Sequence, residues 1–143
     1  NLGLAFGFLV FAQAITSYFI GKYSDKIGRL PFLIFTGYAS SLVFFLYTFV
    51  TTTFQLYIIQ IFLGIAMAME LTISKAFLGD LTRKHKRGSQ IGKYDFVIGV
   101  FGGIAIIIGG FLIGKFGFQI IFYLGSIFFF LATTLLFLIK KNS

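Results

Sequence analysis

Cysteine is absent from this 143-residue sequence, and charged residues make up only 11% of it. Without cysteine the chain forms no disulfide, has no thiolate nucleophile and offers no cysteine ligand to a metal. Only four residues are acidic, whereas 58% are hydrophobic and 20% are aromatic. A water-soluble domain of this length needs far more polar surface to cover its core. The composition therefore predicts an integral membrane protein, with the lipid bilayer as its first partner.

Recognisable catalytic and ligand-binding motifs are also missing from the sequence. It has no histidine cluster, no G-x-S-x-G segment, no phosphate-binding glycine loop and no pair of acids inside an apolar run. Its one histidine, His85, lies in the basic segment RKHKR, and we expect a solvated loop residue there and not a metal ligand. We therefore expect no enzyme activity, no metal and no cofactor.

Five long apolar runs divide the chain, each close to the roughly 20 residues that a helix needs to cross a bilayer core. Their expected bounds are 2–20, 31–50, 54–78, 94–114 and 118–139. The runs do not alternate between polar and apolar residues, as the strands of a membrane barrel would. The expected fold class is all-α, with a single polytopic membrane domain over residues 1–143. Because the chain opens with Asn1 and Leu2 already lies in the first run, we expect a piece of a longer protein.

Basic residues are distributed unequally between the two sides of these spans. The segments 51–53 and 115–117 lie on one side and contain only Lys115. The other side carries ten basic residues: Lys22, Lys26, Arg29, Arg83, Lys84, Lys86, Arg87, Lys93, Lys140 and Lys141. By the positive-inside rule this second side is cytoplasmic, and the C-terminus lies there too. The net charge of +8 is therefore interpreted as a topology signal and not as a nucleic-acid surface.

Small residues form a stripe along the first span and another along the fourth. The glycines of the two stripes are Gly3, Gly7 and Gly21 in the first, which also contains Ala14, and Gly99, Gly103, Gly110 and Gly114 in the second. Such stripes allow helix backbones to approach closely in a bilayer, where no hydrophobic force drives helix association. We expect these residues to serve helix packing, including packing against partners outside the chain.

Glu70 is the one acid that lies well inside an apolar run. A charge near the bilayer centre costs about 2.5–3.5 kcal/mol on insertion scales, so such acids are seldom without a role. Glu70 shares one broad helical face with Gln60, Gly64, Met67 and Ser74. Two interpretations stay open. The carboxyl contacts solute or a proton along a water-filled path, or it is a structural group neutralised by a base or by protonation.

Two further charged residues lie near the cytoplasmic ends of spans. Lys75 is expected to extend its ammonium group to the membrane surface, with an ion pair as the alternative. Asp95 opens the fourth expected span, where we expect it to cap the helix or to pair with a loop residue. Neither residue is assigned a chemical role.

The segment GKYSDKIGRLP, residues 21–31, resembles the loop motif G-x-x-x-D-[RK]-x-G-R-[RK] of the major facilitator superfamily. The residues that match in order and spacing are Gly21, Asp25, Lys26, Gly28 and Arg29. Leu30 departs from the final basic position. The motif is expected between two membrane helices on the cytoplasmic side, where the charge count places it independently. Downstream, RGSQIGKYDF and GGFLIGKFGFQIIFYL resemble the loop and the helix pair that follow in this family.

The resemblance implies an architecture of two six-helix halves, of which this chain would be one half without its first helix. Gln60 in place of a family arginine, and Ala105 with Ile106 in place of a Gly-Pro pair, favour the C-terminal half. The third span would line the cavity, the first and fourth would face the other half, and the second and fifth would face lipid. Asp25 and Arg29 would carry a latch that opens and closes as the halves rock.

The function implied by the resemblance is secondary active transport of a small solute by alternating access, with protons as a candidate coupling ion. The candidate solute or proton contacts are Gln60, Met67, Glu70 and Ser74. The implied partners are the missing half and the solute, in a bacterial-type plasma membrane. The alternative is a non-transporting scaffold or assembly module built on the same fold.

Overall fold

The computed structural model describes residues 2–141, except for the side chains of Asp25 and Ile27. Its elements are α1 (Leu2–Ile27), α2 (Arg29–Tyr47), α3 (Thr53–Leu81), the short 3-10 helix η1 (Lys84–Lys86), α4 (Arg87–Phe116) and α5 (Gln119–Lys141). The five long helices are each long and apolar enough to cross a membrane, and residues 2–141 contain no strand. The predicted all-α, five-span membrane fold is confirmed.

Two helices extend well beyond the apolar runs that predicted them. α1 continues through the charged segment after Ile20 as far as Ile27, and α4 begins at Arg87, well before the predicted start at residue 94. Charged and polar residues do not by themselves end a helix, so hydrophobicity marks the membrane boundary and not the helix boundary. Residues 21–30, which connect the first two apolar spans, are thus helical except at Gly28.

The chain reverses direction between α1 and α2 at a single residue, Gly28. Its φ of 96° lies in a region that residues with a Cβ rarely adopt, so glycine is required at this turn. The Gly28 N–H donates to the Ser24 carbonyl oxygen at 3.2 Å. Pro31 follows in the first turn of α2, where backbone N–H groups have no helical acceptor and a missing donor costs little. This part of the loop motif is thus explained by backbone geometry.

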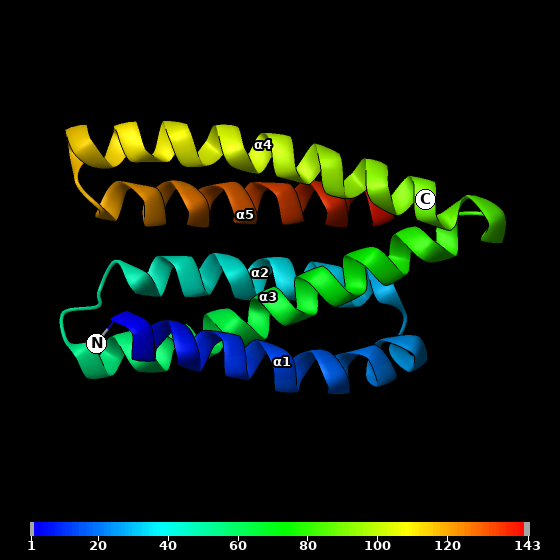
Figure 1. Ribbon diagram of the computed structural model, residues 1–143, viewed down its shortest axis with the longest axis horizontal. Helices are drawn as coiled ribbons and strands as arrows, with labels where there is room; N and C mark the ends of the chain where they lie inside the picture. The colour runs from blue at the N-terminus through cyan, green and yellow to red at the C-terminus, as the bar shows by residue number, and fades with distance from the viewer. Residues whose placement is uncertain (1, 142–143) are drawn as a thin grey trace.

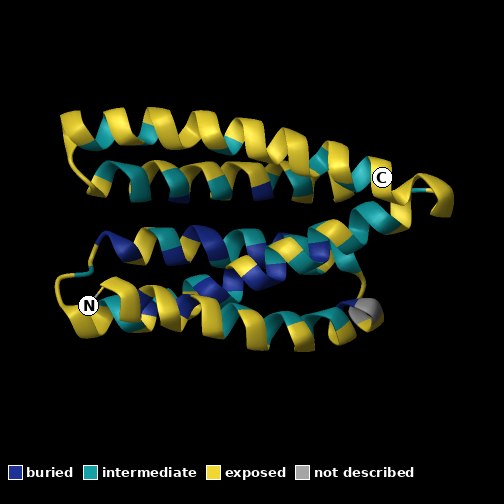
Figure 2. Ribbon diagram, viewed as in Figure 1, coloured by how far each residue is buried: buried dark blue, intermediate teal, exposed yellow. Residues whose placement is uncertain are grey.

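The helices are arranged so that α1 packs along α3, and α2 lies between α3 and α5 (Figure 1). α4 forms a hairpin with α5 and touches α3 only sparsely. Burial is concentrated on α2 and α3, whereas α4 has no buried residue (Figure 2). The small core therefore lies around α3, the helix that carries Glu70.

Specific side-chain contacts hold α2 against α5. The Ser41 hydroxyl donates to the Ser126 carbonyl oxygen at 2.8 Å, and the rings of Tyr47 and Phe122 stack with their centroids 4.7 Å apart. Hydrogen bonds between membrane helices contribute about 0.6 kcal/mol each on average. Many apolar side chains on the outer faces of α2 and α5 are exposed, whereas the facing sides of these two helices pack on each other. The predicted lipid-facing role thus applies to only part of each helix surface.

The two predicted glycine stripes contact no neighbouring helix within the described chain. An added Cβ would meet no atom within 4 Å at Gly3, Gly7, Gly21, Gly99, Gly103, Gly110 or Gly114. Close approach occurs instead at Gly37, where a Cβ would overlap the Thr133 hydroxyl, and at Gly64, where it would overlap the Leu9 carbonyl oxygen. The stripes lie on faces that no described helix covers. Their packing against partners outside the chain stays a prediction.

Candidate functional site

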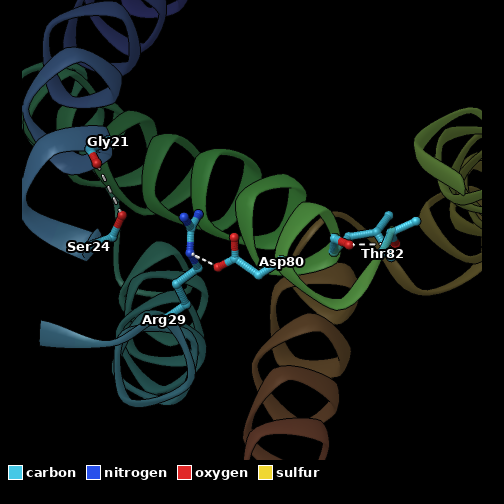
Figure 3. Close-up of polar contacts among 6 residues, drawn as sticks. Gly21, Ser24, Arg29, Asp80 and Thr82 are labelled. Carbon is cyan, nitrogen blue, oxygen red and sulfur yellow. Dashed lines mark hydrogen bonds and ion pairs between the residues drawn. The ribbon is translucent and has the colours of Figure 1, made fainter. Parts of the chain in front are cut away.

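The loop motif lies at the end of the bundle that carries the α1–α2 turn and the α3–α4 loop, which we name the basic end. Arg29 opens α2, and its Nε forms an ion pair with Asp80 Oδ2 of α3 at 2.5 Å (Figure 3). The Arg29 side chain is 21% exposed and that of Asp80 is 52% exposed, so the pair lies near the surface. It joins the start of α2 to the last turns of α3.

A groove of about 600 Å³ adjoins this ion pair. It is lined by Ser24, Gly28, Arg29, Leu30, Pro31, Phe77 and Asp80. The Ser24 hydroxyl donates to the Gly21 carbonyl oxygen at 3.4 Å, on the α1 side of the turn (Figure 3). Of the other motif residues, Lys26 is exposed, and the Asp25 side chain lies outside the described residues.

Asp80 is a site residue that the sequence reasoning did not single out. The available signal was its position, because it is the only acid between Glu70 and Asp95 and lies where basic residues gather. A lone carboxylate in such a region is a natural partner for a base. Sequence order does not show which base it contacts, since Arg29 lies 51 residues earlier in the chain. The packing of α2 along α3 brings the two side chains together.

A second ion pair joins α3 to α4. Lys75 Nζ lies 3.1 Å from Asp95 Oδ1 and 3.3 Å from Asp95 Oδ2, and both side chains are about half exposed. For Lys75 the alternative interpretation, an ion pair, is the one observed. The expectation that Asp95 caps a helix was wrong because α4 begins at Arg87, two turns earlier. α3 thus provides an acid to α2 and a base to α4.

Glu70 lines a cavity of about 290 Å³ between α2, α3 and α5. The lining residues are Glu70 and Ser74 of α3, Leu33, Thr36 and Gly37 of α2, and Phe128, Phe129, Ala132, Thr133 and Leu136 of α5. The polar side chains among them are one carboxyl and three hydroxyls. The Thr36 hydroxyl donates to the Phe32 carbonyl oxygen at 2.9 Å. Within residues 2–141, no side chain forms an ion pair or hydrogen bond with Glu70.

The other residues of the predicted polar stripe do not line this cavity. Gly64 packs against the α1 backbone at Leu9. Gln60, one turn earlier, has its Oε1 buried without a hydrogen-bond partner among the described residues. Met67 is 38% exposed. The stripe is therefore divided between the α1 contact and the α2–α5 cavity, and only Glu70 and Ser74 line that cavity together.

An unpaired carboxyl beside hydroxyl oxygens can exchange a proton or bind a small hard cation, because oxygen atoms suit such cations. In the part of the chain that the structure describes, no three His, Cys, Asp or Glu side chains gather as a metal-binding group. The chemistry available at this cavity is therefore that of one carboxyl inside a membrane-spanning helix.

The sequence profile of the Major Facilitator Superfamily matches residues 1–143. The chain belongs to this superfamily. An uncharacterised MFS-type transporter, YitZ of Bacillus subtilis, is 30% identical over 109 residues, which are 76% of this chain and 66% of YitZ. The tetracycline resistance protein, class H, of Pasteurella multocida is 37% identical over 97 residues, which are 68% of this chain and 23% of that protein. No solved structure matches this chain significantly.

A third relative, the uncharacterised MFS-type transporter MJ1560 of Methanocaldococcus jannaschii, is 26% identical over 76% of this chain and 28% of its own length. The chain thus spans less than two thirds of each of these superfamily proteins. Membership of the superfamily and the transporter relatives support a role in membrane transport, and they do not favour the scaffold alternative. None of the three relatives is named as an enzyme.

Proposed function

We propose that the chain is one part of a secondary transporter that moves a small solute across a membrane by alternating access. The observation that carries this proposal is the superfamily match over the whole chain. In this mechanism two helical bundles rock against each other around a site near the bilayer midplane. The second bundle would be a partner of this chain. The departures at Gln60, Ala105 and Ile106 favour placing the chain in the C-terminal half.

The proposed gate is the ion pair and groove at the basic end. While Arg29 and Asp80 are paired, the start of α2 is tied to the end of α3. A partly exposed ion pair contributes about 1 kcal/mol or less, so it can break and re-form during a transport cycle without a high barrier. By the superfamily resemblance, Asp25 and Lys26 belong to the same latch. The gate would then act through α3, the helix that also carries Glu70.

The proposed coupling residue is Glu70. Its carboxyl lies in a membrane-spanning helix and lines a cavity with Ser74, Thr36 and Thr133. Binding a proton or a solute cation there changes the charge inside the membrane, and it therefore changes the relative free energy of the transporter states that expose Glu70 differently. Gln60 and Met67 do not line this cavity but share the broad helical face of Glu70, and we propose them as further solute contacts.

The proposed location is a bacterial-type plasma membrane with the basic end in the cytoplasm, because the basic residues gather at that end. Tetracycline is the first solute to test, since one relative is named for resistance to it.

The test is solute flux through vesicles that contain the full-length protein, under an imposed pH gradient and with tetracycline in the solute panel. We expect gradient-dependent flux with the wild type and its loss in Glu70→Gln, which keeps the size of the side chain but removes the ionisable group. Lys115→Gln is the control, because it changes one charge at the opposite end of the bundle, and it should retain flux.

Two outcomes would contradict the proposal in different ways. Gradient-driven flux that Glu70→Gln leaves unchanged would refute the coupling role of Glu70 but not transport. No flux with any solute of the panel would count against transport itself.

A further inference from the structure

Nine basic residues at the basic end take no part in the two ion pairs described above, and two of them, Lys22 and Lys26, belong to the end of α1. The other seven come from the α3–α4 loop, η1, the first turns of α4 and the last turn of α5, and all are exposed. We name them the basic cluster: Arg83, Lys84, Lys86, Arg87, Lys93, Lys140 and Lys141.

The basic cluster has no counter-charge among the described side chains. Asp80 is paired with Arg29, and Asp95 is paired with Lys75. Glu70 lies inside the membrane-spanning part of α3. No residue of the cluster forms an ion pair with a described residue. The excess of bases sets the topology, and in the described part of the chain these charges remain available to an anionic group.

The α4–α5 hairpin sets the depth of the cluster. The two helices run antiparallel from the turn at Gly117, so residues equally distant from this turn lie at similar depth. Lys93 precedes Gly117 by 24 residues and Lys141 follows it by 24 residues. At 1.5 Å per residue this is about 36 Å, slightly more than the roughly 30 Å of a hydrocarbon core. In the view of Figure 1, the red end of α5 points toward the same end of the bundle as the first turns of α4.

The α3–α4 loop lies further out on the same side. Arg87 precedes Lys93 by six residues, or about 9 Å along α4. This distance is close to the Debye length of about 8 Å at physiological ionic strength. The loop is therefore placed to contribute attraction to a charged membrane surface, and the length of the hairpin places Lys93, Lys140 and Lys141 just beyond a hydrocarbon core, at the depth expected for headgroups.

Exposed apolar side chains adjoin the cluster on the membrane side. Phe96 is 70% exposed and Ile139 is 65% exposed, close in sequence to Lys93 and Lys140 respectively. A phospholipid has the same two features, an acyl chain next to a charged phosphate, whereas a free anion or a nucleic acid has no acyl chain. We propose that the basic cluster is a binding surface for the headgroups of anionic phospholipids, with Lys93, Lys140 and Lys141 contacting the phosphate.

The test is lipid binding to the purified full-length protein, measured by native mass spectrometry during titration with phosphatidylglycerol or phosphatidylcholine. Each basic residue near an anionic surface contributes about fivefold in affinity. We therefore expect the wild type to bind phosphatidylglycerol at least about fivefold more tightly than phosphatidylcholine, and we expect high salt to remove this preference. The triple variant Lys93→Gln, Lys140→Gln, Lys141→Gln should lose about fivefold or more in affinity for phosphatidylglycerol alone.

The matched control is the triple variant Lys93→Arg, Lys140→Arg, Lys141→Arg, which keeps the charges and should bind like the wild type. Both triple variants retain the loop from Arg83 to Arg87, so the main topology signal stays in place. A wild type without lipid preference, or a glutamine variant that keeps the preference, would overturn the proposal. So would displacement of phosphatidylglycerol by inorganic phosphate at constant ionic strength, because the cluster would then recognise phosphate and not lipid. The measurement needs no flux, so its outcome is independent of the proposed transport function.

Discussion

Replacement of Gly64 by alanine is expected to push α1 away from α3. An added Cβ would overlap the Leu9 carbonyl oxygen and would lie 3.1 Å from the Leu9 carbonyl carbon and 3.2 Å from the Ala12 Cβ. Carbon atoms in ordinary contact are about 3.5–4.0 Å apart, so α1 has to move outward by several tenths of an ångström or more. The opposing atoms are backbone atoms and a Cβ, and no change of side-chain rotamer relieves the overlap.

The expected cost follows from two opposing contributions. An extra methyl group in a packed interface costs about 1–3 kcal/mol. The better helix propensity of alanine recovers at most about 1 kcal/mol. Because the overlap is with backbone atoms, the packing cost lies in the upper part of its range, about 2–3 kcal/mol, and we expect Gly64→Ala to lower the free energy of unfolding by about 1–2 kcal/mol. The matched control is Gly79→Ala in the same helix, where an added Cβ meets no atom within 4 Å. This control should be neutral or slightly stabilising.

The assay is unfolding of the purified protein in mixed micelles, followed by circular dichroism as the fraction of sodium dodecyl sulfate is raised. Gly64→Ala should unfold at a lower detergent fraction than both the wild type and Gly79→Ala. Equal midpoints for the two alanine variants would refute the close α1–α3 contact and the reasoning built on it.

Two further predictions concern the gate and the orientation of the chain. Arg29→Asp and Asp80→Arg should each reduce flux, because each breaks the ion pair that joins α2 to α3. The double variant should restore part of the flux, because it forms the pair with the charges exchanged. A double variant with no more flux than either single variant would contradict this role. Since the chain has no cysteine, single introduced cysteines can be labelled selectively. A membrane-impermeant maleimide should label Thr53→Cys on intact cells, and it should label Ser89→Cys only after permeabilisation; the opposite pattern would reverse the proposed orientation.

The membrane spans could be predicted from the sequence because each is a local property of about 20 consecutive residues. The length of an apolar run does not show where a helix ends. The charged segments 21–27 and 87–93 remain helical outside the apolar runs, so the C-terminal end of α1 and the N-terminal end of α4 lie beyond the expected bounds. Gly28 was found through its motif, and the structure adds the reason, a turn with φ of 96°.

The candidate site could be predicted in part. Glu70 was recognisable because an acid in an apolar run is costly. The helices that surround it were not recognisable, and the structure places its cavity between α2 and α5 and separates it from Gly64 and Gln60. Arg29 was recognisable from its motif, whereas its partner Asp80 was not, because no local pattern relates residues 51 positions apart.

By itself, the amino-acid sequence determined that this chain crosses a membrane as helices, which end of the bundle is basic, and which acid lies within a span. These properties depend on the composition of short segments and on the cost of placing charge in hydrocarbon. Only the tertiary structure decided that Arg29 pairs with Asp80, that Lys75 pairs with Asp95, and that Gly64 touches the α1 backbone while the predicted glycine stripes remain uncovered within the chain. Those contacts depend on how the helices cross and rotate against one another, and that geometry results from the packing of the whole bundle.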